Sequence, residues 1–176
     1  MKLKDILYIA VIAAGYAGLT VLIAPIAYGP IQVRISDIFL VLPFNKKFGT
    51  KAIWGLTIGT FIANLNSPYN PYDLILGTTA SFISALAIYL CGKYIKNRKV
   101  GLIAGIAASI VIVDFFIAFL LLNFIFKVPL GISMLGVTIG QIISVGIGGY
   151  LLAIGLEKKF PEEGEQQIAE SLQSNS

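Results

Sequence analysis

The sequence predicts an all-α integral membrane protein with six transmembrane helices. Of its 176 residues, 57% are hydrophobic and 12% are charged, whereas soluble domains carry roughly 25% charged residues. The apolar residues form long blocks, several of which approach the roughly 20 residues that a helix needs to cross a bilayer. A transmembrane barrel would instead show segments of about 10 residues that alternate between apolar and polar, and the sequence has no such alternation.

Turn formers separate the apolar blocks into six expected helices. The first block lacks a small-residue cleavage site after a short apolar core, so we expect it to remain a helix and not a cleaved signal peptide. Proline and glycine end the first and second helices, and a loop rich in asparagine and proline follows the third. The expected helices cover residues 3–27, 35–44 or 31–44, about 52–65, 72–90 or a little beyond, 100–126 and 131–156. Residues 1–157 are expected to form one membrane domain, and residues 158–176 a polar, acidic, disordered cytoplasmic tail.

The basic residues predict the orientation of these helices. Lysine and arginine are retained on the cytoplasmic side of membranes, and here they cluster before the first helix, in every second connection and after the last helix. Of thirteen basic residues, only Arg34 and Lys127 fall on the other side. We therefore expect both termini in the cytoplasm. A five-helix topology that omits residues 35–44 would place the Lys46 cluster outside, against this rule.

The composition excludes several kinds of chemistry. The chain has no histidine and one cysteine, Cys91, so it can form no internal disulfide and no structural zinc site of Cys and His ligands. It has no nucleophile elbow and no phosphate-binding loop. We expect no enzyme activity, no metal and no cofactor in this chain.

Three aspartates lie within or beside apolar segments, where a charge costs roughly 2.5–3.5 kcal/mol on insertion scales. Asp114 has no basic residue within one helical turn, and two interpretations stay open for it: a neutral carboxyl bonded to a neighbouring helix, or a ligand contact in a polar cavity. Asp73 begins a helix just after Pro71, where helix capping explains it. Asp37 lies three residues after Arg34, so the two side chains pair if that segment is helical.

Amide and aromatic side chains accompany these charges. Asn64 and Gln141 bridge helices or face a ligand. Tyr28 and Tyr69 lie in expected outer loops, where they belong to an interfacial aromatic belt or stack on a planar polar ligand.

Small residues form a pattern in the first helix that permits close helix contact. Four alanines fit small-xxx-small spacing, namely Ala10, Ala13, Ala14 and Ala17. The contact is either within this chain or with a partner.

With these residues in view, the sequence resembles the substrate-binding S components of energy-coupling factor (ECF) importers, in the family assigned to queuosine precursors. The resemblance covers the first half of the chain, whereas the second half is similar mainly in hydropathy. The matching segments are residues 24–37 (APIAYGPIQVRISD), 42–44 (LPF), 52–55 (AIWG), Gly59, 63–65 (ANL), 67–69 (SPY), Asp73 and Gly77.

The resemblance implies an S-component-like bundle in a prokaryotic plasma membrane that captures one small molecule at the outer face. The expected ligand is a 7-deazaguanine, such as 7-aminomethyl-7-deazaguanine, or a related vitamin-like molecule. The implied partners are a transmembrane coupling protein, docked on the alanines of the first helix, and two subunits that hydrolyse ATP. The expected substrate-binding residues are Tyr28, Gln32, Arg34, Asp37, Asn64, Tyr69, Asp73, Asp114 and Gln141.

The chain departs from the expected family pattern at three positions. Asp37 stands where we expect glutamate, Gln141 where we expect glutamate, and Asp114 where we expect asparagine. The alternative function is a stand-alone secondary transporter or channel for a small polar solute, although the internal repeat common in such proteins is not evident.

Overall fold

The computed structural model describes residues 2–28 and 33–160, and every regular element in these ranges is a helix. Ten helical elements follow one another along the chain. They are α1 (Leu3–Leu22), α2 (Ala24–Ala27), η1 (Ile35–Phe44), α3 (Gly49–Asn64), α4 (Tyr72–Tyr94), α5 (Arg98–Val113), η2 (Asp114–Ile125), α6 (Leu130–Gln141), η3 (Ile142–Gly149) and α7 (Tyr150–Lys159).

Two long helical rods each contain a π-helical segment, and the helix continues into it without a break. α5 continues into the π-helix η2 as one rod of 28 residues, and α6, the π-helix η3 and α7 form another of 30 residues. With α1 and α4 these rods are the four described helices that are long and apolar enough to span a membrane. The molecule is therefore a multi-pass membrane protein, and large apolar side chains such as Val111, Leu135 and Leu151 are exposed along its sides.

The six expected helical segments are confirmed as helices. The first ends earlier, at Leu22, because Ala24 begins the separate short helix α2, which has Pro25 in its first turn. The fourth continues a little beyond Leu90, to Tyr94, as expected. The second and third are shorter than a span: η1 has 10 residues and α3 has 16, or about 20 Å and 24 Å against a hydrocarbon core of about 30 Å. Six complete crossings and the cytoplasmic orientation stay predictions. Most of the predicted tail, residues 161–176, lies outside the described residues.

The short helix η1 is the centre of the bundle. It packs against α1, α3, α4, η3 and α7, and Leu40 and Val41 within it are fully buried. A 3₁₀ helix of this length is uncommon, and here neighbouring helices surround it. Polar residues at its first turn are therefore held inside the protein and away from lipid.

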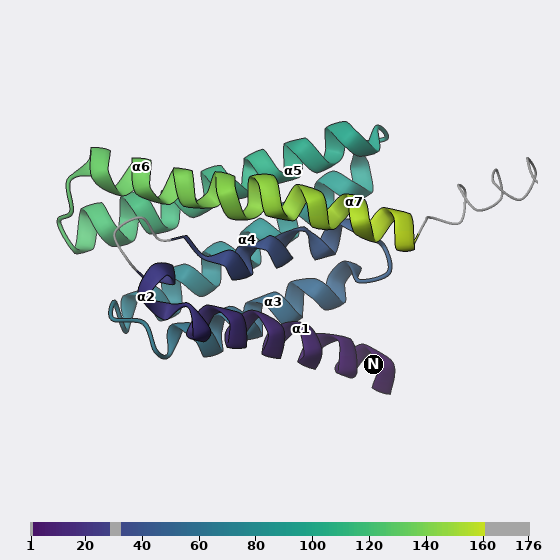
Figure 1. Cartoon of the computed structure of the whole chain (residues 1–176), viewed down its shortest axis with the longest axis horizontal. Coiled ribbons are helices and arrows are strands. Elements are labelled where there is room, and N and C mark those ends of the chain that lie inside the picture. The colour runs from purple at the N-terminus through teal and green to yellow at the C-terminus, as the bar shows by residue number, and fades with distance from the viewer. Residues whose placement is uncertain (1, 29–32, 161–176) are drawn as a thin grey trace, which may run out of the picture.

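A glycine lets α1 approach α3 closely. A Cβ atom added to Gly59 would lie 2.8 Å from the carbonyl oxygen of Ala13, well inside contact distance. This contact holds α1 across α3 in the lower layer of Figure 1, while α5, α6 and α7 form the upper layer. The N-terminal end of α1 and the C-terminal end of α7 lie at the same end of the bundle (Figure 1), together with the basic connections.

Candidate functional site: a buried polar cavity

A buried ion pair between Arg34 and Asp73 joins the start of η1 to the first turn of α4. The Nη2 atom of Arg34 lies 2.9 Å from Oδ2 and 3.2 Å from Oδ1 of Asp73, and the two side chains are 7% and 0% exposed. Ser67 Oγ donates a third bond to Asp73 Oδ2 at 2.7 Å. The ring of Tyr28 lies 5.2 Å from the Arg34 guanidinium carbon, within cation–π range.

Two expectations about these charges are wrong. Arg34 does not pair with Asp37, because Arg34 precedes η1 in an extended conformation, so the helical spacing of three residues does not apply. Asp73 does not serve as a helix cap, since its carboxylate is taken up by Arg34 and Ser67. Sequence spacing identified the residues but not their partners.

Asn64 completes the surroundings of Asp73. Its Nδ2 atom donates to the Asp73 carbonyl oxygen at 2.9 Å, and Gly77 lies against both residues. A Cβ at Gly77 would be 2.5 Å from Asn64 Nδ2 and 2.6 Å from Asp73 Oδ1. Only glycine leaves room for this arrangement.

Asp37 is held by a different pair of residues. Tyr16 of α1 donates its hydroxyl to Asp37 Oδ1 at 2.5 Å, and Gln141 of α6 donates its amide to Asp37 Oδ2 at 2.6 Å. All three side chains are buried. Both bonds link residues distant in sequence, so the carboxylate of Asp37 ties three helices together.

Tyr16 was missed by the sequence analysis. It lies inside an apolar block, and a buried tyrosine hydroxyl usually finds a hydrogen-bond partner. Its hydroxyl is a polar group in the middle of a predicted span, so, like the intramembrane carboxylates, it needs a partner.

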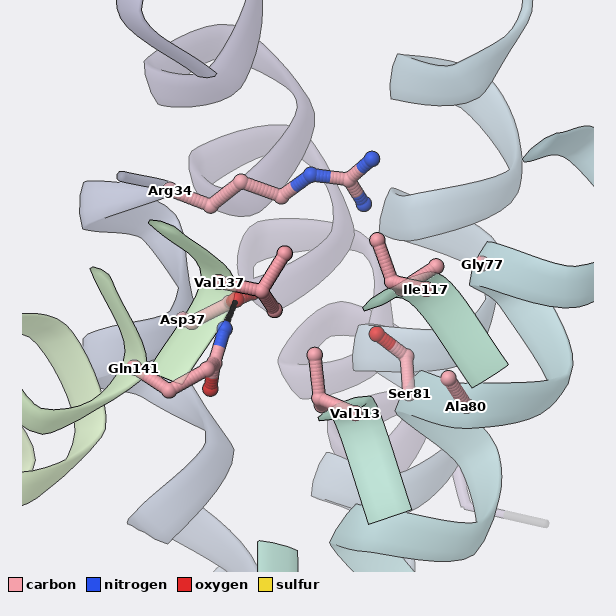
Figure 2. A pocket seen from close by; sticks show the side chains of 9 residues that line it. All are labelled: Arg34, Asp37, Gly77, Ala80, Ser81, Val113, Ile117, Val137 and Gln141. Atoms are coloured by element: carbon pink, nitrogen blue, oxygen red, sulfur yellow. Dashed lines mark hydrogen bonds between the residues drawn. The ribbon is translucent and has the colours of Figure 1, made fainter. Parts of the chain in front are cut away.

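These groups surround a small cavity lined by both polar and apolar side chains. In Figure 2 the Arg34 side chain extends across one end of the space, Gln141 and Asp37 lie at one side, and Ser81 lies at the other. The cavity volume is about 10 Å³, enough for about one water. The remaining walls are Gly77, Ala80, Val113, Ile117 and Val137.

Two polar atoms of the cavity residues have no hydrogen-bond partner among the described residues. They are Nε of Arg34, a donor, and Oε1 of Gln141, an acceptor. Because Gln141 Nε2 is committed to Asp37, the amide carbonyl is the free end of that side chain. A buried unsatisfied group costs about 1–3 kcal/mol, so the cavity offers a ligand one donor and one acceptor that the protein leaves unused.

The other predicted binding residues lie away from the cavity wall. Asp114 accepts a hydrogen bond from Thr138 Oγ1 of α6 at 2.7 Å, so its carboxyl group is bonded to a neighbouring helix. Asp114 does not line the cavity. Tyr69 packs edge-on against Phe126, with ring centroids 4.9 Å apart. Gln32 lies outside the described residues. A binding role for the predicted residues stays a prediction.

The four alanines of α1 fall on two sides of the helix. Ala13 and Ala17 are buried, with Ala13 against Gly59 of α3, whereas Ala10 and Ala14 are exposed. Only the latter two are accessible to a partner in this structure.

No group of three metal-ligating side chains comes together in residues 2–28 and 33–160. The unbonded donor of Arg34 and acceptor of Gln141 suit hydrogen bonding to a small organic molecule. A polytopic helical membrane protein with a buried polar cavity belongs to the class that handles small solutes.

The chain belongs to the QueT transporter family, whose family description, QueT transporter, matches residues 6–158. It is therefore a membrane transport protein. It is similar to the queuosine precursor transporter QueT of Lactococcus lactis subsp. cremoris (strain MG1363), with 31% identity over 159 residues, which cover 86% of this chain and 91% of the relative. No solved structure shows a significant match to the chain.

Proposed function

We propose that this chain is the substrate-binding S component of an ECF-type importer and that it captures a queuosine precursor, a 7-deazaguanine, in the polar cavity. The observation that carries the proposal is the buried donor of Arg34 beside the buried acceptor of Gln141, neither of them bonded within the described residues. Family membership and the name of the Lactococcus relative support the substrate class.

A 7-deazaguanine matches the groups of the cavity. Its guanine edge carries N–H groups, which suit the Gln141 carbonyl, and a carbonyl oxygen, which suits the Arg34 donor. Its flat faces suit the apolar walls formed by Val113 and Ile117. The same arrangement discriminates against adenine, which lacks the carbonyl oxygen and would leave the Arg34 donor unpaired.

The aminomethyl form of the ligand adds a positive charge. Asp73 is neutralised by Arg34, and Asp114 lies outside the cavity wall. Asp37 lines the cavity and is hydrogen-bonded to two neutral side chains. It is therefore the carboxylate that offsets the ligand cation.

Binding requires the cavity to widen. A space of about 10 Å³ accommodates no bicyclic molecule, so the helices that form its walls have to move apart. The ligand then replaces lost wall contacts with bonds to Arg34 and Gln141.

A titration of the purified chain tests the site. We expect binding of 7-aminomethyl-7-deazaguanine in calorimetry, weaker binding of guanine and none of adenine. Gln141→Leu should weaken binding by about 10-fold or more, because it leaves a ligand N–H unpaired. Asn123→Leu is the control, since Asn123 bonds to the Val128 carbonyl outside the cavity. Equal affinity of both variants would place the ligand elsewhere.

The same proposal assigns partners in a prokaryotic plasma membrane. A coupling protein would dock on the exposed Ala10 and Ala14 of α1, where small side chains let two helix backbones approach, and two associated subunits would hydrolyse ATP. We expect Ala14→Leu to abolish copurification with the coupling protein and the ATPases while ligand binding by the chain alone is unchanged. Uptake into liposomes by the purified chain without partners would instead support a stand-alone transporter.

A further inference from the structure

A second hollow lies between α5 and α7, at the basic end of the bundle, where α1 begins and α7 ends (Figure 1). Its volume is about 520 Å³, much larger than the polar cavity, and the two share no lining residue. Basic side chains form its rim, with Leu102, Tyr150 and Ile154 below them. We propose that this groove binds an anionic phospholipid, with the lipid phosphate between Lys99 and Lys158 and an acyl chain along Tyr150 and Ile154.

The charges of the groove favour an anion. Arg98 and Glu157 neutralise each other, with Arg98 Nη2 and Nε lying 2.7 and 3.0 Å from Glu157 Oε1, and this pair fastens α5 to α7. Lys99 and Lys158 are exposed, and neither makes a salt bridge or hydrogen bond with a described residue. Two positive charges on the rim are thus available to a phosphate.

The backbone adds to this potential. Lys99 lies in the first turn of α5, a helix of 16 residues capped by Asn97, whose side chain accepts from the Val100 amide. The first turn of a helix carries partial positive charge. A phosphate beside Lys99 meets both the ammonium group and this end of the helix.

The position of the groove distinguishes a lipid from a soluble anion. α5 begins the candidate span of residues 98–125, and α7 ends that of residues 130–159. The groove therefore lies where spanning helices leave the hydrocarbon core, at the depth of lipid headgroups. Ile154 lies one turn from Lys158 toward the membrane, so a phosphate on the lysines places its acyl chain against this half-buried apolar wall. A free phosphate would leave that wall uncovered.

Lipid binding to the full chain tests the proposal. The purified chain in neutral detergent is titrated with phosphatidylglycerol, phosphatidylcholine or glycerol 3-phosphate, and bound lipid is counted by native mass spectrometry beside the melting temperature. We expect phosphatidylglycerol to bind and to raise the melting temperature, and the other two to have little effect.

Matched variants distinguish lipid binding in the groove from binding to the general positive charge at this end of the bundle. Lys99→Gln with Lys158→Gln should weaken phosphatidylglycerol binding by about 10-fold or more, since each basic residue near an anionic headgroup contributes about 1 kcal/mol. Lys4→Gln with Lys96→Gln removes the same charge outside the groove and should retain binding. The proposal would be overturned by an equal loss of phosphatidylglycerol binding in both variant pairs, by equal binding of phosphatidylcholine, or by an equal rise in melting temperature with glycerol 3-phosphate. It would also be overturned if hexaglutamate raised the melting temperature and phosphatidylglycerol did not, which would indicate an acidic protein partner.

Discussion

The guanidinium of Arg34 binds the carboxylate of Asp73, 39 residues away, and leaves the nearer Asp37 to neutral partners. The two buried aspartates, Asp73 and Asp37, therefore have different kinds of partner. Asp73 neutralises Arg34, whereas Asp37 lines the cavity and is hydrogen-bonded to the neutral side chains of Tyr16 and Gln141.

Removing one partner of the Arg34–Asp73 pair should strongly destabilise the fold. We expect Asp73→Asn or Arg34→Met to lower the free energy of unfolding by about 3–5 kcal/mol, because an uncompensated buried charge or donor remains. Reversible denaturation in detergent measures this loss. Lys51→Gln is the control: the Lys51–Asp5 pair is 3.5 Å long and partly exposed, so its loss should cost no more than about 1 kcal/mol. A similar loss for both pairs would contradict the buried geometry.

Gly77→Ala should disturb the same region without changing any charge. The added methyl meets Asn64 and Asp73 at 2.5–2.6 Å, and overpacking of this kind costs about 1–3 kcal/mol. Gly131→Ala is matched to it, because a Cβ there meets nothing within 4 Å. Thermal unfolding of the two variants gives the comparison, and equal melting temperatures would refute the close contact.

Tyr16→Phe tests a positioning role. The variant keeps the ring but removes the hydroxyl that donates to Asp37, so Asp37 should turn from its present orientation. We expect ligand affinity to fall several-fold, more for the aminomethyl ligand than for guanine, as measured by calorimetry. Tyr72→Phe, at an exposed position, should have no effect. An equal fall for both ligands would indicate a purely structural role for Tyr16.

Asp37→Asn and Asp114→Asn should differ in ligand preference. The first removes the carboxylate in the cavity wall and should abolish the preference for 7-aminomethyl-7-deazaguanine over its neutral 7-cyano form. The second retains a group that accepts from Thr138 outside the wall, and should leave the preference intact. Competition binding with the two ligands measures both, and the reverse result would move the cation site to Asp114.

The helices could be predicted because local signals define them. Runs of apolar residues and the turn formers or basic residues between them identified all six helical segments, including the short η1 at residues 35–44. Their exact ends were less predictable: α1 ends at Leu22 and a separate helix, α2, follows it. That η1 lies at the centre depends on its packing against α1, α3, α4, η3 and α7, which no local pattern reports.

Three of the predicted binding residues line the cavity, and their role in binding stays a prediction. Arg34, Asp37 and Gln141 were expected there because polar groups in apolar segments need partners, and all three line the cavity. Asp114 met the same criterion, yet its partner Thr138 lies on the adjacent α6 and keeps it from the cavity wall. Tyr16 satisfied the criterion too but was hidden among apolar neighbours.

The sequence by itself determined that this chain is a helical membrane protein with a few costly polar groups, because hydropathy and charge act residue by residue. Only the tertiary structure decided which of these groups meet. Asp37 and Gln141 are 104 residues apart, and a hydrogen bond between them forms only when η3, which directly follows Gln141, packs beside η1. The physical reason is that hydrogen bonds act over about 3 Å, so their pairing is set by how distant helices approach.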